Sequence, residues 1–319
     1  MPTTMLMHAV RSIMRGGIVF SAVVLSVMSW RDLPAQNVAR PPSRAVTDWS
    51  AVDEALGRKG AAQPSEVMKY AFPRSDLQVM VAGVPVKPAL ALGSWVAFKT
   101  VAGGHAMAMG DLVLLEDEVG PVMRALQEGS VELTALHNHV LGEAPRVMYM
   151  HFAAHGDAVT MARTIRTALA ATKTPLSAPA APPATSAIDL DTAAIARTLG
   201  IAGKVNGGVY QVAVPRRERI REGRNEIPPS MGVATAINFQ PTGGGKAAIT
   251  GDFVMRASEV NGVIRELLNS GIAVSALHSH MLTEEPRLFF MHFWANDDAI
   301  MLAKGLRAGL GHTASQFGK

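Results

Sequence analysis

The chain has 319 residues and contains no cysteine. It therefore has no disulfide framework, no thiolate nucleophile and no cysteine that could carry a lipid anchor. Thiolate metal sites are excluded for the same reason. Any metal site must use histidine, aspartate, glutamate or backbone oxygen.

A strong excess of charge is also missing. Charged residues make up 18% of the chain and the formal net charge is +4. Residues 1–35 hold three arginines and one aspartate, so the remainder carries only +2. Nucleic-acid-binding proteins usually show a much larger excess clustered on one face. We expect no nucleic-acid partner, and the 48% hydrophobic content predicts a globular chain.

Long apolar runs are confined to the N-terminus. Residues 16–30 form one apolar run after Arg11 and Arg15, shorter than the ~20 residues of a membrane helix. A basic start, a short apolar stretch and the small residue Ala35 are typical of a signal peptide. We predict a signal peptide over residues 1–35, export to the periplasm or beyond, and no membrane span after cleavage. An uncleaved anchor is the alternative.

The chain repeats itself. Shifting it by 141 residues places residues 110–169 on residues 251–310 without a gap, with 25 identities in 60 positions. Such a long period indicates two homologous units, not a solenoid. The units are expected over residues 49–169 and 190–310, joined by a linker rich in proline and alanine over residues 170–189.

Each unit has a mixed pattern, typical of an α+β fold in which helices pack on an antiparallel sheet. Apolar periodicity and capping residues predict helices over residues 48–57, 118–129 and 156–169, and over residues 191–200, 259–271 and 297–310. Alternating or β-branched segments predict strands over residues 75–86, 94–101 and 105–114, and over residues 207–216, 234–241 and 247–255. Asp157 and Asp298 should lie in the first turns of the last helices.

One histidine pattern is written twice. "ALHNHVLGEAPRVMYMHF" occupies residues 135–152 and "ALHSHMLTEEPRLFFMHF" occupies residues 276–293. If each stretch is a hairpin whose turn centres near Ala144, His137 lies opposite His151 and shares a face with His139. The histidines found at matching positions in both units are His137, His139 and His151 and their counterparts His278, His280 and His292.

Three histidines, or two histidines and a carboxylate, form the ligand set of catalytic zinc and of non-haem iron or manganese. We therefore predict a site for a divalent metal in each unit, with zinc as the leading candidate. A hydrogen-bonded histidine cluster under a domain interface, or a pocket for a non-metal ligand, would also explain the pattern.

Charged residues near the histidines suggest further roles. In a metal-dependent hydrolase of the cell envelope, Glu143 or Glu284 would be the general base. Arg146 and Arg287 would hold an anionic substrate, although surface arginines paired to these glutamates are the alternative. Asp111 and Asp252 could each orient a histidine.

No nucleotide-binding loop or serine-nucleophile motif occurs. A non-catalytic envelope binding or scaffold module is the other hypothesis, so the sequence does not decide whether the chain is an enzyme. The partner would be an unidentified small molecule or an envelope component.

The histidine stretches carry a family resemblance. "TALHNHVLGEAPRVMYMHF", "GDAVTMARTIRTAL" and "FPRSDLQVMVAGVPV", with the second copies of the first two, resemble the LppY/LpqO family of exported bacterial proteins. The resemblance implies a duplicated fold of unknown function and export, and assigns no catalytic residue. The chain departs from lipoprotein members because it has no cysteine, and its second unit departs from the first over residues 215–232.

Overall fold

The computed structural model describes residues 48–177 and 187–317. The expected signal peptide, and residues 178–186 of the expected linker, lie outside the described residues. Within the two described ranges, no helix is long and apolar enough to cross a membrane.

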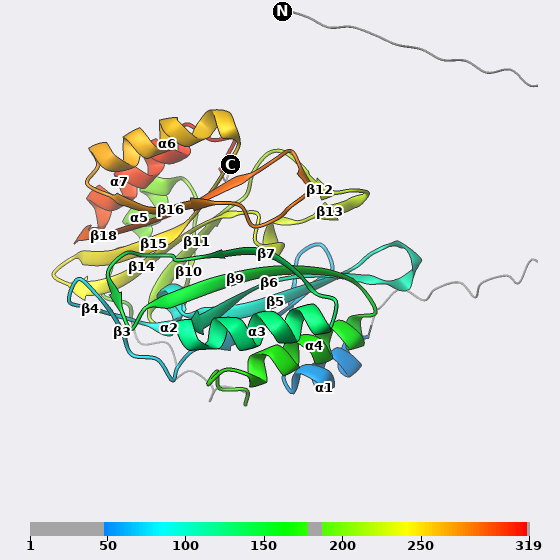
Figure 1. Ribbon diagram of the computed structural model, residues 1–319. Helices are drawn as coiled ribbons and strands as arrows, with labels where there is room; N and C mark the ends of the chain where they lie inside the picture. Colours follow the sequence, from blue (N-terminus) through cyan, green and yellow to red (C-terminus); the bar gives the residue numbers. More distant parts are fainter. Residues whose placement is uncertain (1–47, 178–186, 318–319) are drawn as a thin grey trace, which may run out of the picture. The chain divides into compact units, whose positions relative to one another are not determined.

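The two units have the same order of strands and long helices (Figure 1). The first unit consists of α1 (Ser50–Leu56), β1 (Ala61–Gln63), β2 (Val67–Pro73), β3 (Val79–Val81), β4 (Val84–Val86), α2 (Pro88–Ala91), β5 (Gly93–Thr100), η1 (Ala102–Gly104), β6 (Ala106–Leu115), α3 (Glu116–Glu128), β7 (Glu132–His137), β8 (Glu143–Ala144), β9 (Val147–Gly156) and α4 (Ala158–Ala170). The second consists of α5 (Thr192–Leu199), β10 (Lys204–Asn206), β11 (Val209–Val214), β12 (Ile220–Glu222), β13 (Asn225–Ile227), η2 (Pro229–Met231), β14 (Thr235–Gly243), β15 (Lys246–Met255), α6 (Ala257–Asn269), β16 (Ala273–His278), β17 (Glu284–Glu285), β18 (Phe289–Asp298) and α7 (Ala299–Leu310).

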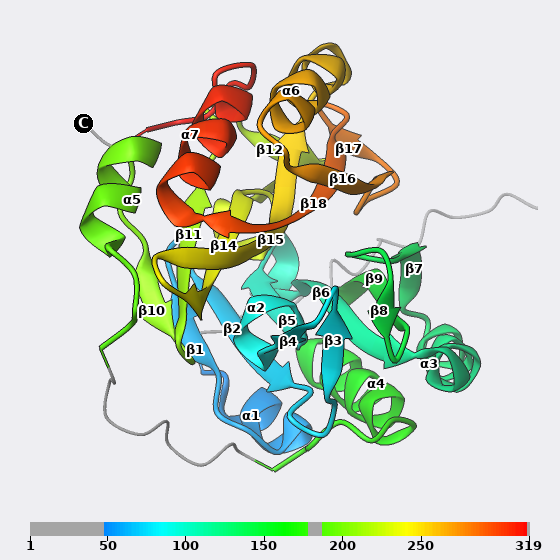
Figure 2. The ribbon, with the colours of Figure 1, turned by 90° about the vertical axis from the view of Figure 1, so that its left-hand side faces the viewer.

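Each unit is built on a six-stranded antiparallel sheet. The strand order is β1-β2-β5-β6-β9-β7 in the first sheet and β10-β11-β14-β15-β18-β16 in the second. Helices α1, α3 and α4 cover the outer face of the first sheet, and α5, α6 and α7 cover that of the second (Figures 1 and 2). The α+β prediction for two homologous units is confirmed.

The outer faces hold a separate apolar core in each unit. In the first unit, Phe98 and Phe152 from the sheet pack with Ile165 of α4. In the second, Phe239 and Phe253 pack with helices α6 and α7. Asp157 and Asp298 are the N-caps of α4 and α7, as the sequence predicts. Asp157 accepts a hydrogen bond from the amide of Thr160, and Asp298 accepts from the amides of Ile300 and Met301.

The inner faces of the two sheets are covered by the opposite unit. One inner core joins Met109 of β6 to Phe290 of β18, and the other joins Tyr149 of β9 to Trp294 of β18. Polar contacts add to this packing, since Gln240 accepts from the amide of Lys87 and donates to the carbonyl of Pro85. The two units therefore share part of their core.

One strand prediction is wrong. Residues 75–86 do not form a single strand but the hairpin β3–β4, because Ala82 and Gly83 take positive φ angles of 46° and 80° and reverse the chain. The counterpart of β11 is β2, which occupies the same place in the strand order. Strands β12 and β13 are the second-unit equivalents of β3 and β4.

The interleaved charges of residues 215–226 predict a solvated strand and loop, and four of the five arginines in this stretch are exposed. Arg216 is the exception, because it is buried and forms ion pairs with Glu259 at 2.7 Å and Glu218 at 2.9 Å. Arg74 in the first unit is equally buried and pairs with Glu118 at 2.6 Å. The repeated arginine thus anchors the first turn of helix α3 or α6 to its sheet.

Candidate metal centre

The histidines are presented by the edge strand and its neighbour in each sheet. In the first unit, His137 pairs with Tyr149 and Ala135 pairs with His151, with a register shift between Leu133 and Ala135. The prediction that His137 lies opposite His151 is therefore wrong by two residues. Because side chains alternate with a period of two, His137 and His151 still project from the same face.

The second unit repeats this arrangement. His278 pairs with Phe290, and Ala276 pairs with His292. The residues between the strands do not form a tight hairpin turn as expected, because Glu143 and Ala144 leave the main sheet to pair with β3. Glu284 and Glu285 pair with β12 in the same way.

The histidines of the two units interleave across the inner faces. His137 stacks on His278 with ring centroids 3.6 Å apart, and His151 stacks on His280 at 3.7 Å. The rings of His139 and His292 are tilted by 31°, with centroids 3.8 Å apart. Exchanging each residue for its repeat counterpart reproduces these three pairs, so the cluster has pseudo-twofold symmetry. The two sites predicted from the sequence form one cluster.

Two aspartates complete this cluster. Asp111 of β6 is in register with His151, and Asp252 of β15 is in register with His292. The Asp111 carboxylate lies 3.8 Å from Nε2 of both His139 and His151. Asp252 Oδ2 lies 3.1 Å from His280 Nε2. We call the six histidines, Asp111 and Asp252 the histidine–aspartate cluster.

The cluster contains buried polar atoms without hydrogen-bond partners among the described residues. They are Nε2 of His137, His139, His151 and His292, Nδ1 of His278, and Oδ1 of Asp111 and Asp252. His151 is 5% exposed and His292 is 2% exposed. An unpaired buried polar atom costs roughly 1–3 kcal/mol. Seven such atoms in one cluster are explained better by a bound ion than by the packing of a folded core alone.

The surroundings keep the imidazoles neutral. Burial lowers the pKa of His137 to about 4 and lowers the pKa values of His139, His151 and His280 well below the ordinary value. Burial, followed by the charge of neighbouring His280, also lowers the pKa of His278. A neutral imidazole is the form that binds a metal, so these rings need lose no proton.

The pKa values of the two carboxyl groups in the cluster are shifted upwards. Burial, and then the charge of Asp252, raises the pKa of Asp111 to about 8, while Lys69 partly opposes this rise. Burial raises the pKa of Asp252 to about 6, with His292 opposing it. A cation inside the cluster would favour both carboxylates in their charged form.

Four groups of histidine and aspartate side chains in the described part of the chain have ligand atoms that lie within 4.8 Å of one another. Within the described ranges, they are His137–His151–His278–His280, Asp252–His278–His280–His292, His137–His139–His292 and Asp111–His139–His151. All six histidines predicted as metal ligands occur in these groups. The two aspartates, which the sequence suggested only as orienting partners, are members as well. Their signal was a matched Gly-Asp pair in both units.

Glu143 and Glu284 are not members of these groups. Glu143 Oε1 accepts a hydrogen bond from the amide of Val147 at 3.4 Å. Glu284 Oε1 accepts one from Leu288 at 2.8 Å. Both carboxylates thus close the loop before β9 or β18, and a general-base role stays a prediction.

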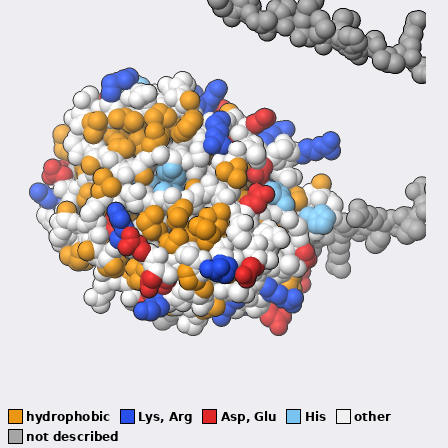
Figure 3. Space-filling view, viewed as in Figure 1, with side chains coloured by type: hydrophobic (Ala, Val, Ile, Leu, Met, Phe, Trp, Pro, Cys, Tyr) orange, Lys and Arg blue, Asp and Glu red, His pale blue; other side chains and the backbone are white. Residues whose placement is uncertain are grey.

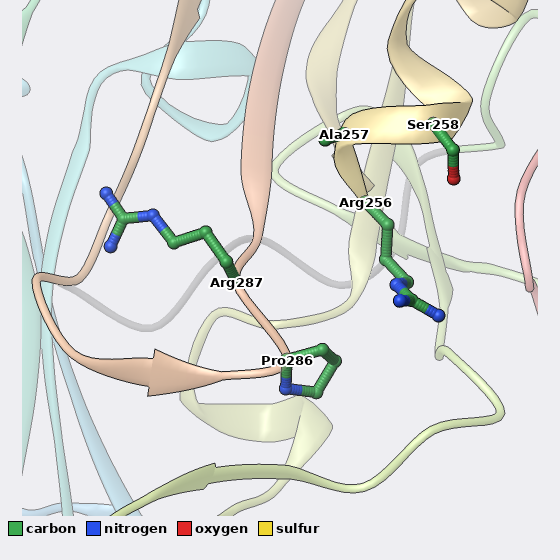
Figure 4. A pocket seen from close by; sticks show the side chains of 5 residues that line it. All are labelled: Arg256, Ala257, Ser258, Pro286 and Arg287. Atoms are coloured by element: carbon green, nitrogen blue, oxygen red, sulfur yellow. The ribbon is translucent and has the colours of Figure 1, made fainter.

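The two arginines make different contacts. Arg146 is exposed and pairs with Glu116 at 3.4 Å, whereas Arg287 pairs with Glu284 at 3.2 Å and donates to the Met281 and Leu282 carbonyls. Arg287 also lines a cavity of about 280 Å³ with Arg256, Ala257, Ser258 and Pro286. Figure 4 shows the side chains of Arg256 and Arg287 pointing away from each other, so they do not form an anion clamp there.

The surface near the cluster is apolar. In Figure 3, histidine side chains reach the surface at the centre of the face, between two hydrophobic patches. The edge strands β7 and β16, which contact each other, carry the exposed counterparts Leu136 and Leu277. The His139 side chain, just beyond the end of β7, is itself 15% exposed, so the cluster is partly open to solvent.

The two halves of the cluster differ in their neighbours. Tyr149 stacks on His139 at 3.2 Å, whereas its counterpart Phe290 stacks on His280 at 3.6 Å. Lys69 lies over the ring of Trp95, which is the residue in register with Asp111. Burial lowers the pKa of Lys69 to about 8. The strand registers place Gln211 at the equivalent position of the second sheet. At this position the first sheet therefore has a lysine and the second a glutamine.

A model of the family described as Domain of Unknown Function (DUF1259) matches residues 50–171 and 193–312. No curated protein matches the chain. A trimeric bacterial microcompartment shell protein, PduB, is 12% identical over 79% of this chain and 91% of that chain, with a TM-score of 0.19. EtuB from Clostridium kluyveri is 10% identical over 79% of this chain and 90% of that chain, with a TM-score of 0.18. At such low TM-scores, neither likeness carries an argument about fold or function.

Proposed function

The chain belongs to the family described as Domain of Unknown Function (DUF1259), and we propose that its two repeats jointly bind divalent metal in the histidine–aspartate cluster. The observation that supports this most is the set of converging, buried ring nitrogens without hydrogen-bond partners among the described residues. Neither repeat supplies all eight side chains, so the duplication itself builds the site.

The donor set limits the choice of metal. Imidazole nitrogen with carboxylate oxygen suits zinc, iron, manganese, cobalt or nickel better than calcium or magnesium, which favour oxygen ligands. Zinc remains the leading candidate. The ligand atoms are already close, since Nε2 of His278 and His280 lie 2.9 Å apart and Asp252 Oδ2 lies 3.1 Å from the latter. Two nitrogens bound at ~2.1 Å to one ion lie about 3.0 Å apart in octahedral geometry and about 3.4 Å apart in tetrahedral geometry, so a small adjustment would suit either.

A hydrogen-bonded histidine cluster under an interface is the competing interpretation. The interleaved rings do lie between the two sheets. Some ring nitrogens have partners, because His292 Nδ1 donates to the Gly251 carbonyl and His137 Nδ1 donates to the Asn138 carbonyl. Five others in the described part of the chain have none, and this favours metal binding.

Metal analysis of purified protein tests the proposal. The protein is incubated with Zn²⁺, Mn²⁺, Fe²⁺, Co²⁺ or Ni²⁺, separated from free ions and analysed by mass spectrometry for bound metal. The variant His137→Ala with His278→Ala should lose most of the metal. The matched variant His105→Ala with His312→Ala, which removes two histidines outside the cluster, should retain it. A wild-type chain that retains none of these ions would overturn the proposal.

We also propose that the chain is exported and that its family corresponds to the LppY/LpqO group. The N-terminal pattern of Arg11, Arg15 and the apolar residues 16–30 supports export, and the histidine stretches support the family name. Expression in a bacterial host followed by N-terminal sequencing of the periplasmic fraction tests export. A full-length chain retained in the cytoplasm would contradict it.

A further inference from the structure

The four ligand groups cannot all be filled together. His137–His151–His278–His280 shares at least one residue with each of the other three groups, and so does His137–His139–His292. One pair has no residue in common, namely Asp111–His139–His151 and Asp252–His278–His280–His292. We call these the first set and the second set.

The two sets are related by the repeat. Asp111, His139 and His151 correspond to Asp252, His280 and His292 at a spacing of 141 residues. Each set has one carboxylate, which offsets part of the charge of one divalent ion. Together they use seven of the eight side chains, leaving His137. A single four-coordinate ion would leave four of the eight side chains of the cluster unused.

The sets differ in how completely they enclose an ion. The second set has four ligands, and its closest ligand atoms lie 2.9 and 3.1 Å apart. The first set has three ligands, and Asp111 lies 3.8 Å from both of its histidines. Protein sites with four ligands are typically structural, whereas sites with three protein ligands keep a position for water or substrate.

The charges around the two sets also favour the first set as the one that accepts an external ligand. Two divalent ions with two carboxylates leave a net positive charge in a buried site, and Lys69 beside the first set adds to it. The equivalent position beside the second set is Gln211. An external ligand of the first ion is therefore favoured if it is negatively charged, such as hydroxide or a small oxyanion.

We infer that the histidine–aspartate cluster holds two metal ions, one enclosed by the second set and one in the first set with a coordination position open to a small anion. This inference rests on the proposed metal-binding function. It adds the number of ions, the unequal roles of the repeats and the class of the external ligand.

Counting ions in isosteric variants tests the first part. Wild-type protein saturated with Co²⁺ should retain two ions per chain by native mass spectrometry. Asp111→Asn and Asp252→Asn should each retain one, and Asp117→Asn, an exposed aspartate of helix α3, should retain two. If either variant fails to fold by circular dichroism, His151→Gln or His292→Gln replaces it.

Inorganic phosphate tests the open position. In Asp252→Asn, where the first set holds the ion, phosphate should shift the visible absorption of bound Co²⁺. In Asp111→Asn, where the enclosed second set holds it, the spectrum should not move. Shifts in both variants, or in neither, would overturn the assignment of open and enclosed sets.

The outcomes separate this inference from the proposed function. A wild-type chain that saturates at one ion overturns the two-ion centre but leaves metal binding intact. A chain that binds no ion overturns both.

Discussion

His137 and His278 occupy the same position in the two repeats and stack on each other with ring centroids 3.6 Å apart. Residues 141 positions apart in sequence can meet this way only if they lie near the axis that relates the repeats. His139 with His292 and His151 with His280 then form two symmetry-related pairs around that axis. Metal bound in this cluster would therefore lie where the two repeats meet.

Metal binding should release protons in a pH-dependent way. The pKa of Asp111 is raised to about 8 and that of Asp252 to about 6, and both must be ionised to bind metal. At pH 7 Asp111 is mostly protonated and Asp252 mostly ionised, so about one proton should be released. The number should rise towards two at pH 5 and fall towards zero above pH 9.

Titration calorimetry in buffers of different ionisation enthalpy measures these protons. Asp111→Asn removes the group with the higher pKa, so this variant should release almost none at pH 7. A proton count that increases from pH 5 to pH 9 would contradict the assigned protonation states.

Chelation should destabilise the whole chain. A ligand that binds only the folded state at 100 times its dissociation constant stabilises that state by about 2.7 kcal/mol. Zn²⁺ at such a concentration should raise the midpoint of thermal unfolding by several degrees, and EDTA should reverse the increase. Differential scanning calorimetry measures it, and the variant His151→Ala with His292→Ala should show no response to Zn²⁺. An equal response in wild type and variant would place the bound zinc elsewhere.

The order of elements was largely predictable from the sequence because the signals are local. Asp157 followed by an amphipathic run predicts helix α4, and the apolar patterns of residues 94–101 and 105–114 predict strands β5 and β6. The shared face of His137 and His151 was also predictable, because side-chain alternation survives a register error of two residues.

The composite cluster was not predictable in the same way. The register of His137 depends on the irregularity between Leu133 and Ala135, and the departure of Glu143 towards β3 opens the expected turn. The stacking of His151 on His280 depends on how two inner sheet faces pack, which is a long-range property. The matched Gly-Asp pairs single out Asp111 and Asp252, but the position of Asp111 beside His151 depends on the pairing of β6 with β9.

The buried arginine of the first unit should be essential for stability. Arg74 is fully buried and pairs with Glu118, so Arg74→Leu would leave a buried carboxylate without its cation. Breaking a buried pair in this way costs about 3–5 kcal/mol of unfolding free energy. Arg146→Leu is the matched control, because its ion pair with Glu116 on the same helix is exposed and should contribute at most about 1 kcal/mol. Urea unfolding of both variants measures the difference, and comparable losses would contradict the structural role of Arg74.

Gly251 should be intolerant of even one added methyl group. A Cβ built there would lie 2.0 Å from the carbonyl oxygen of Ala236 on the neighbouring strand, so the sheet would have to shift. The Gly251 carbonyl also accepts the hydrogen bond from His292 Nδ1, which orients that ring. Gly251→Ala should therefore cost about 1–3 kcal/mol of stability and weaken metal binding together.

Gly93→Ala is the matched strand substitution, since the nearest atom to its added Cβ is 3.9 Å away. This variant should be neutral or stabilised by roughly 0.4–1 kcal/mol through loss of unfolded-state freedom, with metal affinity unchanged. Urea unfolding and calorimetric metal titration of both variants compare the two positions. Unchanged metal affinity in a destabilised Gly251→Ala protein would show that the Gly251–His292 hydrogen bond does not position the histidine for metal.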